Sequence, residues 1–147
     1  MDPELQRVQL TERLYLWQRR HGHRVGTDDV LASWAAAEAN PNAASVLELG
    51  CGHGGVTLML AEALPTTRIL AIEAQDVSYG LLERNVTEAG LSGRVETALG
   101  DIRTTDAIGD RRFDLVTGTP PFMPMGSGTM PADAQRAAAR FELREGV

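Results

Sequence analysis

The sequence predicts a small α/β protein built on a parallel β-sheet. Short apolar runs alternate regularly with longer amphipathic segments between residues 46 and 117. The apolar runs lack the alternating polar residues of a half-exposed strand, which favours a sheet covered by helices. The chain has 147 residues, which allows one such domain and excludes a second full one.

The N-terminal part of the chain is predicted to precede the sheet domain as an extension. Residues 1–27 are expected to form an N-terminal hairpin or extension, and residues 28–147 the sheet domain. Residues 14–17 suit a short strand with one wet face, and residues 19–23 its turn. Because Thr27 and Asp28 precede a run of apolar residues, either one can cap a helix.

The remaining elements follow from apolar runs and from the residues that end them. The predicted order is a helix to about Ala39, strand 46–49, helix 56–64, strand 69–73, helix 78–89, strand 95–99 and strand 113–117. Asn40 and Pro41 end the first helix, Pro65 the second, and Gly90 the third.

Charge and cysteine content exclude several kinds of site. The chain has 14 basic and 20 acidic residues, and its net charge of -6 disfavours strong, non-specific binding of nucleic acid. The basic residues are all arginine, which excludes a Schiff-base lysine and a P-loop lysine. Cys51 is the single cysteine, so neither an internal disulfide nor a thiolate zinc cluster can form, and no metal site is expected.

The sequence also indicates where the protein works. No stretch reaches the roughly 20 apolar residues that a membrane-spanning helix needs. The N-terminal segment MDPELQRVQLTER is too polar for a signal peptide. We therefore expect a cytoplasmic protein without a membrane contact.

A glycine-rich segment follows the first strand of the predicted sheet. Its glycines let the backbone turn sharply and approach a ligand, and the next helix begins with free N–H groups. Gly50, Gly52 and Gly55 fit the spacing of a dinucleotide site. Glu48, with glycines at 50, 52 and 54, fits the loop of S-adenosylmethionine enzymes. The glycines leave both ligands open, and Glu48 favours the second because its carboxylate would oppose a pyrophosphate.

Acidic residues follow the next two strands. Glu73 ends one strand, where a carboxylate can accept both hydroxyls of a ribose. Asp101 follows the other and can accept a hydrogen bond from an adenine amino group. Since the carboxyl ends of parallel strands meet at one edge, these acidic residues together indicate a nucleoside site.

The last predicted strand leads into Thr119, Pro120, Pro121 and Phe122. The two prolines lack N–H donors and stiffen the backbone, which leaves nearby carbonyls to accept hydrogen bonds from an amino group. The ring of Phe122 offers a stacking face. This segment therefore suits a planar amine.

Several segments carry a family resemblance, which covers the chain from about Leu14 to its last residue. They are GHRVGTDDVLASWA, VLELGCGHGG, ILAIEA, GDI, FDLVTGTPPFMPMG and QRAAARFELREGV. In their order and spacing they resemble class I S-adenosylmethionine-dependent methyltransferases of the small-domain type. Within that class they resemble the tRNA(Val) adenine-N6 methyltransferase group. The resemblance implies a Rossmann-like sheet.

The resemblance also implies roles for individual residues. The 50–54 loop would cradle the methionine part of S-adenosylmethionine, Glu73 its ribose and Asp101 its adenine. Residues 119–122 would form the Asn-Pro-Pro-Tyr/Phe acceptor site of the family. The predicted cofactor-binding residues are Thr27, Asp28, Glu48, Gly50, Cys51, Gly52, Gly54, Glu73 and Asp101, and the predicted catalytic residues are Thr119, Pro120, Pro121 and Phe122.

The chain departs from the family in two respects. Thr119 stands where the family has an asparagine, and its shorter hydroxyl weakens the case for adenine N6 as the methyl acceptor. Only about four parallel strands can be found, so the sheet is predicted to be truncated after the fourth. Its exposed edge would then be open to another copy or a partner chain.

The leading hypothesis is an S-adenosylmethionine-dependent methyltransferase acting on an amino group. The acceptor would be an adenine of an RNA such as tRNA, a similar planar substrate, or a small-molecule amine. One alternative is a non-catalytic or partner-completed cofactor-binding fragment of such an enzyme. Another is an NAD-dependent oxidoreductase that uses the dinucleotide spacing of the glycines.

Overall fold

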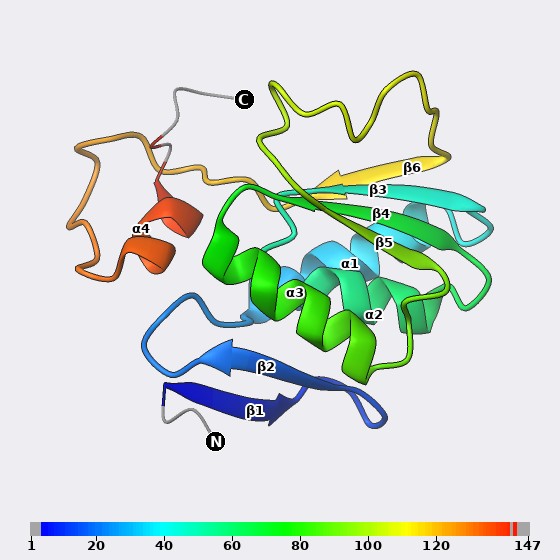
Figure 1. The fold of residues 1–147 in the computed structure, drawn as a ribbon, viewed down its shortest axis with the longest axis horizontal. Helices are drawn as coiled ribbons and strands as arrows, with labels where there is room; N and C mark the ends of the chain where they lie inside the picture. The colour runs from blue at the N-terminus through cyan, green and yellow to red at the C-terminus, as the bar shows by residue number, and fades with distance from the viewer. Residues whose placement is uncertain (1–3, 142, 144–147) are drawn as a thin grey trace.

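The computed structural model describes residues 4–141 and 143 and shows a parallel sheet backed by helices (Figure 1). The strands of the sheet are β3 (Ser45–Leu49), β4 (Arg68–Glu73), β5 (Val95–Leu99) and β6 (Leu115–Gly118). Their order is β5-β4-β3-β6, and every neighbouring pair is parallel. The predicted α/β fold with four parallel strands is therefore confirmed.

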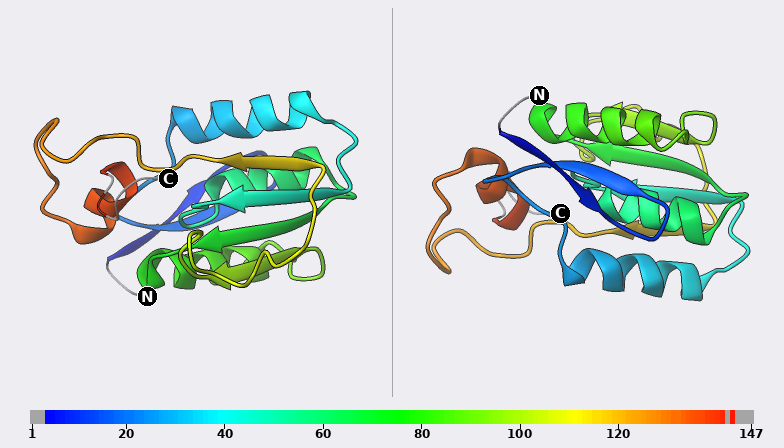
Figure 2. Two further views of the ribbon diagram at one scale, coloured as in Figure 1. Left: turned by 90° about the horizontal axis from the view of Figure 1, so that it is seen from above. Right: turned by 90° about the horizontal axis from the view of Figure 1, so that it is seen from below.

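Helices cover one face of this sheet. They are α1 (Thr27–Ala39), α2 (Gly55–Ala63) and α3 (Asp76–Glu88). Buried residues of all three pack with Val46, Ile69 and Ala71 of this face, and Figure 2 shows α2 between α1 and α3. A short fourth helix, α4 (Ala134–Arg140), lies beyond the carboxyl ends of the strands. Among the described residues, no helix is long and apolar enough to cross a membrane.

The opposite face of the sheet is covered without helices. Leu47, Leu70 and Ile72 are buried there beneath the connection between β5 and β6. That connection covers them with a few apolar side chains, among them Ile102 and Phe113. The prediction of a sheet covered by helices is thus wrong for this face, because the polar 100–112 segment forms turns and supplies apolar side chains at only a few positions.

The N-terminal segment forms the expected hairpin, with its turn in a different place. Strands β1 (Leu5–Gln9) and β2 (Tyr15–Arg19) pair antiparallel. The turn between them is closed by Thr11, whose Oγ1 accepts a hydrogen bond from Leu14 N at 3.0 Å. The prediction of residues 19–23 as the turn is therefore wrong, and they belong to the connection from β2 to α1.

The start of α1 is also capped differently from the prediction. Gly26 is the N-cap residue, and Asp29 Oδ2 accepts a hydrogen bond from Gly26 N at 2.8 Å. Asp29 therefore reaches back from the first turn, as in half of a capping box. Thr27 and Asp28 already lie within the helix and do not cap it.

Asn85 joins the hairpin to the sheet domain. Its side chain, in α3, is 1% exposed. Asn85 Oδ1 accepts from Trp17 N at 2.7 Å, and Nδ2 donates to Trp17 O at 2.9 Å and to His53 O at 2.8 Å. One buried amide thus satisfies main-chain groups from both β2 and the glycine loop.

Glu48 is a buried acid in the central strand β3. It is 1% exposed, and its Oε2 accepts a hydrogen bond from Thr57 Oγ1 at 2.6 Å. Burial raises the pKa of Glu48 to about 8, and the Thr57 bond opposes only part of that rise. The side chain is therefore largely protonated at neutral pH.

Replacing Asn85 with alanine should destabilise the fold by about 3 kcal/mol. The change leaves buried N–H and C=O groups of Trp17 and His53 without their partner. Urea unfolding of both proteins measures the difference. Thr87→Ala, on the exposed side of the same helix, is the matched control and should change stability by less than about 0.5 kcal/mol. Equal effects of the two changes would contradict the bridging role of Asn85.

Glu48 should make the fold less stable as the pH rises. The folded pKa of about 8 exceeds the ordinary value of 4.5, so the stabilisation is complete below pH 4.5 and is lost as pH rises through the folded pKa. In Glu48→Gln this pH dependence is absent. Urea unfolding at several pH values should show Glu48→Gln gaining stability relative to the parent between pH 5 and pH 8. Parallel pH profiles would contradict the raised pKa.

Candidate functional site

A large cavity lies at the carboxyl ends of the parallel strands. Its volume of about 1220 Å³ exceeds the roughly 300–1,000 Å³ of a typical small-molecule site, so it has room for a cofactor and part of a second molecule. Ten of the predicted site residues line it: Asp28, Gly50, Cys51, Gly52, Glu73, Asp101, Thr119, Pro120, Pro121 and Phe122. The fold therefore brings the predicted cofactor and acceptor segments to one cavity.

The glycine loop between β3 and α2 forms one wall of the cavity. Gly50, Gly52 and Gly54 have φ values of 69°, 59° and 94°, in the left-handed region that only glycine adopts at little cost. Gly55, by contrast, is already part of α2. The positive φ angles thus fall on the acidic-x-G-x-G-x-G spacing rather than on the dinucleotide spacing.

Glu73 holds this loop from the end of β4. Its Oε2 accepts a hydrogen bond from Gly52 N, and its Oε1 accepts one from Gln75 N, each at 2.8 Å. Each carboxylate oxygen has a further lone pair, so Glu73 can accept hydroxyl groups from a ligand while it keeps both main-chain bonds. The residue is 6% exposed, which limits solvent competition for those bonds.

Asp101 lies on the cavity wall after β5 and is paired with an arginine that the sequence analysis did not single out. Its Oδ2 lies 2.7 Å from Arg103 Nη2, and its Oδ1 accepts from Arg103 N at 3.0 Å. Asp101 therefore lines the cavity as part of an ion pair. Arg103 also lines the cavity.

Three predicted cofactor residues do not line the cavity. Glu48 is buried below the glycine loop against Thr57. Gly54 is packed, since an added Cβ would lie 2.9 Å from Leu82 Cδ1. Thr27 is exposed at the first position of α1. Glu48 and Gly54 therefore stabilise the conformation of the glycine loop and do not face the cavity.

Two side chains within the glycine loop are buried and uncharged. Burial raises the pKa of the Cys51 thiol well above its usual range, so Cys51 is not a thiolate nucleophile. Burial lowers the pKa of His53 to about 3, with a smaller contribution from nearby His23. The two imidazole rings stand edge to face, 5.5 Å apart. The Nε2 atom of His53 has no hydrogen-bond partner among the described residues.

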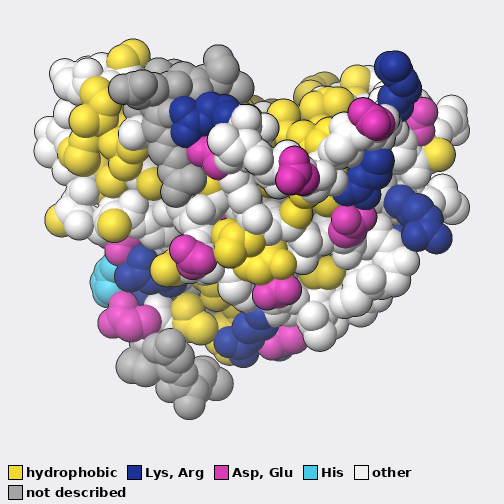
Figure 3. All heavy atoms as spheres, turned by 45° about the horizontal axis from the view of Figure 1, so that its top comes forward, with side chains coloured by type: hydrophobic (Ala, Val, Ile, Leu, Met, Phe, Trp, Pro, Cys, Tyr) yellow, Lys and Arg dark blue, Asp and Glu magenta, His cyan; other side chains and the backbone are white. Residues whose placement is uncertain are grey.

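The segment after β6 forms another wall of the cavity. Gly118 packs so closely on β3 that an added Cβ would lie 2.5 Å from Leu49 O, which fixes the point where this segment leaves the sheet. Phe122 is 77% exposed and lines the cavity. Figure 3 shows hydrophobic side chains gathered on the lobe that this segment and α4 form, and Met125 and Met130 are also exposed.

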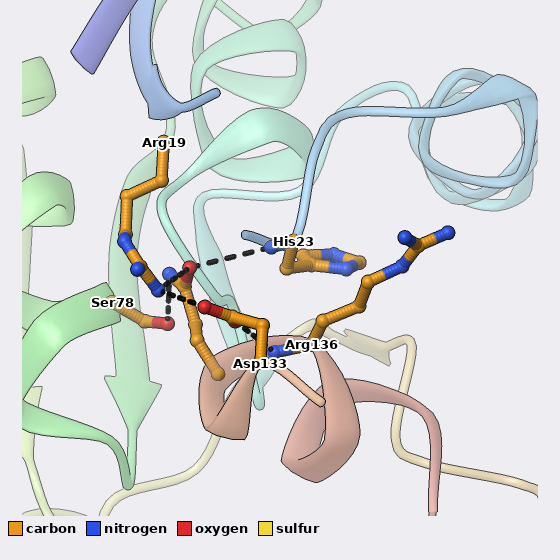
Figure 4. A network of polar contacts seen from close by, with 6 residues as sticks. Arg19, His23, Ser78, Asp133 and Arg136 are labelled. Atoms are coloured by element: carbon orange, nitrogen blue, oxygen red, sulfur yellow. Dashed lines mark hydrogen bonds and ion pairs between the residues drawn. The ribbon is translucent and has the colours of Figure 1, made fainter. Parts of the chain in front are cut away.

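Some cavity residues come from parts of the chain that the sequence analysis assigned no role. Ser78 is in the first turn of α3, and Phe141 directly follows α4. Figure 4 shows Arg136 reaching past His23. Ser78 and Phe141 carry no local motif, so only the folding of α4 against α3 and β2 brings them to the site.

The comparisons with known proteins agree with this geometry. Residues 46–141 match a family described as the methyltransferase domain. This match spans the sheet, the glycine loop and the acceptor segment.

Relatives with known names match most of this chain. The chain is 37% identical over 127 residues to a tRNA1(Val) (adenine(37)-N6)-methyltransferase from Porphyromonas gingivalis, with 81% of this chain and 48% of the relative covered. It is 34% identical over 84 residues to a release factor glutamine methyltransferase from Geobacter sulfurreducens, with 57% of this chain and 28% of the relative covered. The chain thus spans half or less of the length of these relatives.

A solved structure supports the same assignment. The N-terminal domain of EvdMO1 with SAH bound superposes with a TM-score of 0.56 and 34% sequence identity, over 63% of this chain and 38% of that one. Its sheet and that of the present chain share one fold. The chain therefore belongs to the methyltransferase domain family and has the sheet fold of class I S-adenosylmethionine-dependent methyltransferases.

Proposed function

We propose that the protein transfers a methyl group from S-adenosylmethionine to an amino group on an RNA adenine, as in tRNA, or on a similar planar substrate. One observation carries this proposal. One wall of a single cavity is lined by the glycine loop and Glu73, and another wall by residues 119–122. A methyl donor and a planar acceptor would thus meet in it.

The residues of the first wall fit the donor. The glycine backbone leaves open space at Gly50, where an added Cβ would meet nothing within 4 Å. Glu73 can accept ribose hydroxyls, and the first turn of α2 directs N–H groups toward the loop. The SAH bound in the EvdMO1 relative supports this assignment. S-adenosylmethionine, when bound, supplies a methyl group that its sulfonium already activates.

The residues of the second wall fit a planar amine. Pro120 and Pro121 cannot donate hydrogen bonds, so the carbonyls of this segment can accept from the amine. Phe122 offers its exposed ring for stacking. Thr119 can accept a hydrogen bond from the amine if its own proton is donated elsewhere. The chain therefore contributes mainly alignment, which is the chief requirement for transfer from an activated donor.

RNA is the proposed acceptor class for two reasons. The relative from Porphyromonas gingivalis is named for an adenine in a tRNA. Arg24, Arg136 and Arg140 line the cavity, and none of them forms an ion pair with another residue in the described part of the chain. Guanidinium groups so placed can bind phosphates next to a target base.

A second candidate is a cofactor-binding fragment that a partner completes. Within the described residues, β6 pairs with β3 on one side and has no strand on the other. Val116, in β6, is 56% exposed. An open parallel edge of this kind can accept a strand from another copy or another chain.

Cofactor binding should depend on Glu73. Titration calorimetry with S-adenosylhomocysteine should show binding to the parent chain and affinity about 10- to 100-fold lower for Glu73→Gln, which loses charged acceptors for hydroxyl and N–H groups. Glu62→Gln, the same exchange on α2 away from the cavity, should bind as the parent does. A folded parent chain that binds no S-adenosylhomocysteine would contradict the proposed function.

Methyl transfer should respond to Thr119. With tritiated S-adenosylmethionine and total RNA, we expect label in the tRNA fraction and about 10-fold more of it with Thr119→Asn, whose amide carbonyl accepts from the amine without a proton of its own. Phe122→Ala should lose most of the transfer and keep S-adenosylhomocysteine binding. Binding without transfer to RNA by either Thr119 form would favour the fragment alternative.

A further inference from the structure

We infer that Gln135 is a positioning residue, which fixes α4 beside the cavity and so holds the acceptor segment in place. Its role in catalysis rests on the proposed function. Its role in holding α4 does not, and can be tested separately.

Gln135 lies in the first turn of α4 and is only 3% exposed. Its Nε2 donates to Ser78 Oγ in α3 at 3.0 Å, and its Oε1 accepts from His23 N at 3.3 Å (Figure 4). Arg19 Nη1 lies 3.4 Å from the same Oε1. One amide thus connects α4 with the hairpin, with the segment before α1, and with α3.

A second contact supports the same anchoring. Asp133 Oδ2 forms an ion pair with Arg19 Nη1 at 2.8 Å, and Asp133 Oδ1 accepts from Arg136 N at 2.9 Å as the N-cap of α4. The start of α4 is therefore tied to the end of β2 by two neighbouring side chains.

The side-chain amide of Gln135 packs tightly against the backbone at Gly22. A Cβ added at Gly22 would lie 2.0 Å from Gln135 Oε1, far inside any allowed contact. The glycine therefore leaves room for the amide. Ser78, the other partner, is 1% exposed.

The far end of α4 reaches the acceptor segment. Phe141 is 1% exposed and forms a parallel bridge with Met123, and Met123 N donates to Arg140 O at 3.1 Å. Met123 directly follows Phe122, the stacking residue of the proposed acceptor site.

Through these contacts α4 connects two fixed points, the one at Gln135 and the one at Phe141. The helix has seven residues, too few to be stable without tertiary contacts. Its Gln135 end is held by β2 and α3, and its Phe141 end holds the chain next to Phe122. The position of the acceptor segment over the cavity therefore depends on Gln135 as well as on the end of β6.

Proteolysis of the native chain tests the anchor directly. Arg136 and Arg140 are exposed trypsin sites in α4. In Gln135→Leu, which keeps the side-chain bulk and loses the hydrogen bonds, we expect cleavage at these sites to be about 10-fold faster than in the parent. Gln9→Leu, the same exchange on an exposed residue of β1, should leave these rates unchanged. Cleavage after Arg84 in α3 reports global unfolding and should stay equal in all three proteins.

A double-mutant cycle keeps the test valid if Gln135→Leu perturbs the fold. In the parent, Gly22→Ala should speed cleavage in α4, because the new methyl group displaces the side-chain amide of Gln135. In a Gln135→Ala background, the same change should raise the cleavage rate by less than about twofold. The new Cβ also lies 3.0 Å from Arg19 Cβ, a contact common to both backgrounds that cancels in the cycle. Additive effects of the two changes would overturn the anchor.

The catalytic part of the inference needs a separate readout. Gln135→Leu should lower kcat for transfer to total RNA about 10-fold while S-adenosylhomocysteine affinity stays within about threefold of the parent. Equal losses of affinity and kcat would overturn the positioning role. Absence of transfer by the parent would overturn the proposed function alone, because the proteolysis experiments use no cofactor and no acceptor. Unchanged cleavage in Gln135→Leu would overturn the inference even if the parent transfers methyl groups.

Discussion

The carboxylate of Glu73 accepts main-chain N–H groups from Gly52 and from Gln75, and so ties the glycine loop to the end of β4 and to the start of α3. The loop reverses direction through three glycines with positive φ, and the N–H groups of Gly50 and Cys51 also donate to Ile72 O, at 2.9 and 3.1 Å. A charged acceptor that receives two N–H groups is a strong restraint on such a segment. The shape of the glycine loop thus depends on Glu73, the residue that would also bind S-adenosylmethionine.

The buried polar residues around this loop have a shared structural effect. Asn85 satisfies main-chain groups of Trp17 and His53, and Glu48 accepts from Thr57 under the loop. Each is almost fully buried, where an unpaired polar group is costly. These bonds hold the hairpin, the glycine loop and the helices in one arrangement, so the cavity has a defined floor before any ligand arrives.

Charged side chains of both signs line the cavity. The chain as a whole carries a net charge of -6, whereas the lining has four arginines, at 24, 103, 136 and 140, and four acidic residues, at 28, 29, 73 and 101. A local group of guanidinium side chains can attract phosphate even where the total charge would repel it, because screening limits exposed charges to about 10 Å at ordinary salt. The acidic composition therefore argues against non-specific binding along a nucleic acid. It is compatible with a local contact between guanidinium groups and the phosphates beside one base.

The sequence alone predicts the order of the strands along the chain, the glycine loop and the acidic residue that ends β4, because each depends on local patterns of apolar residues, glycines and charge. It misplaced the hairpin turn, since the hydroxyl bonds of Thr11 that close the true turn leave little trace in composition. It also assigned helices to both faces of the sheet, where one face is covered by the side chains of an irregular connection. Only the tertiary structure decided that Gln135 meets Ser78 and the main chain of His23, because those contacts join residues 57 and 112 positions apart. No local pattern specifies contacts at such separations, and the packing of α4 against α3 and β2 alone creates them.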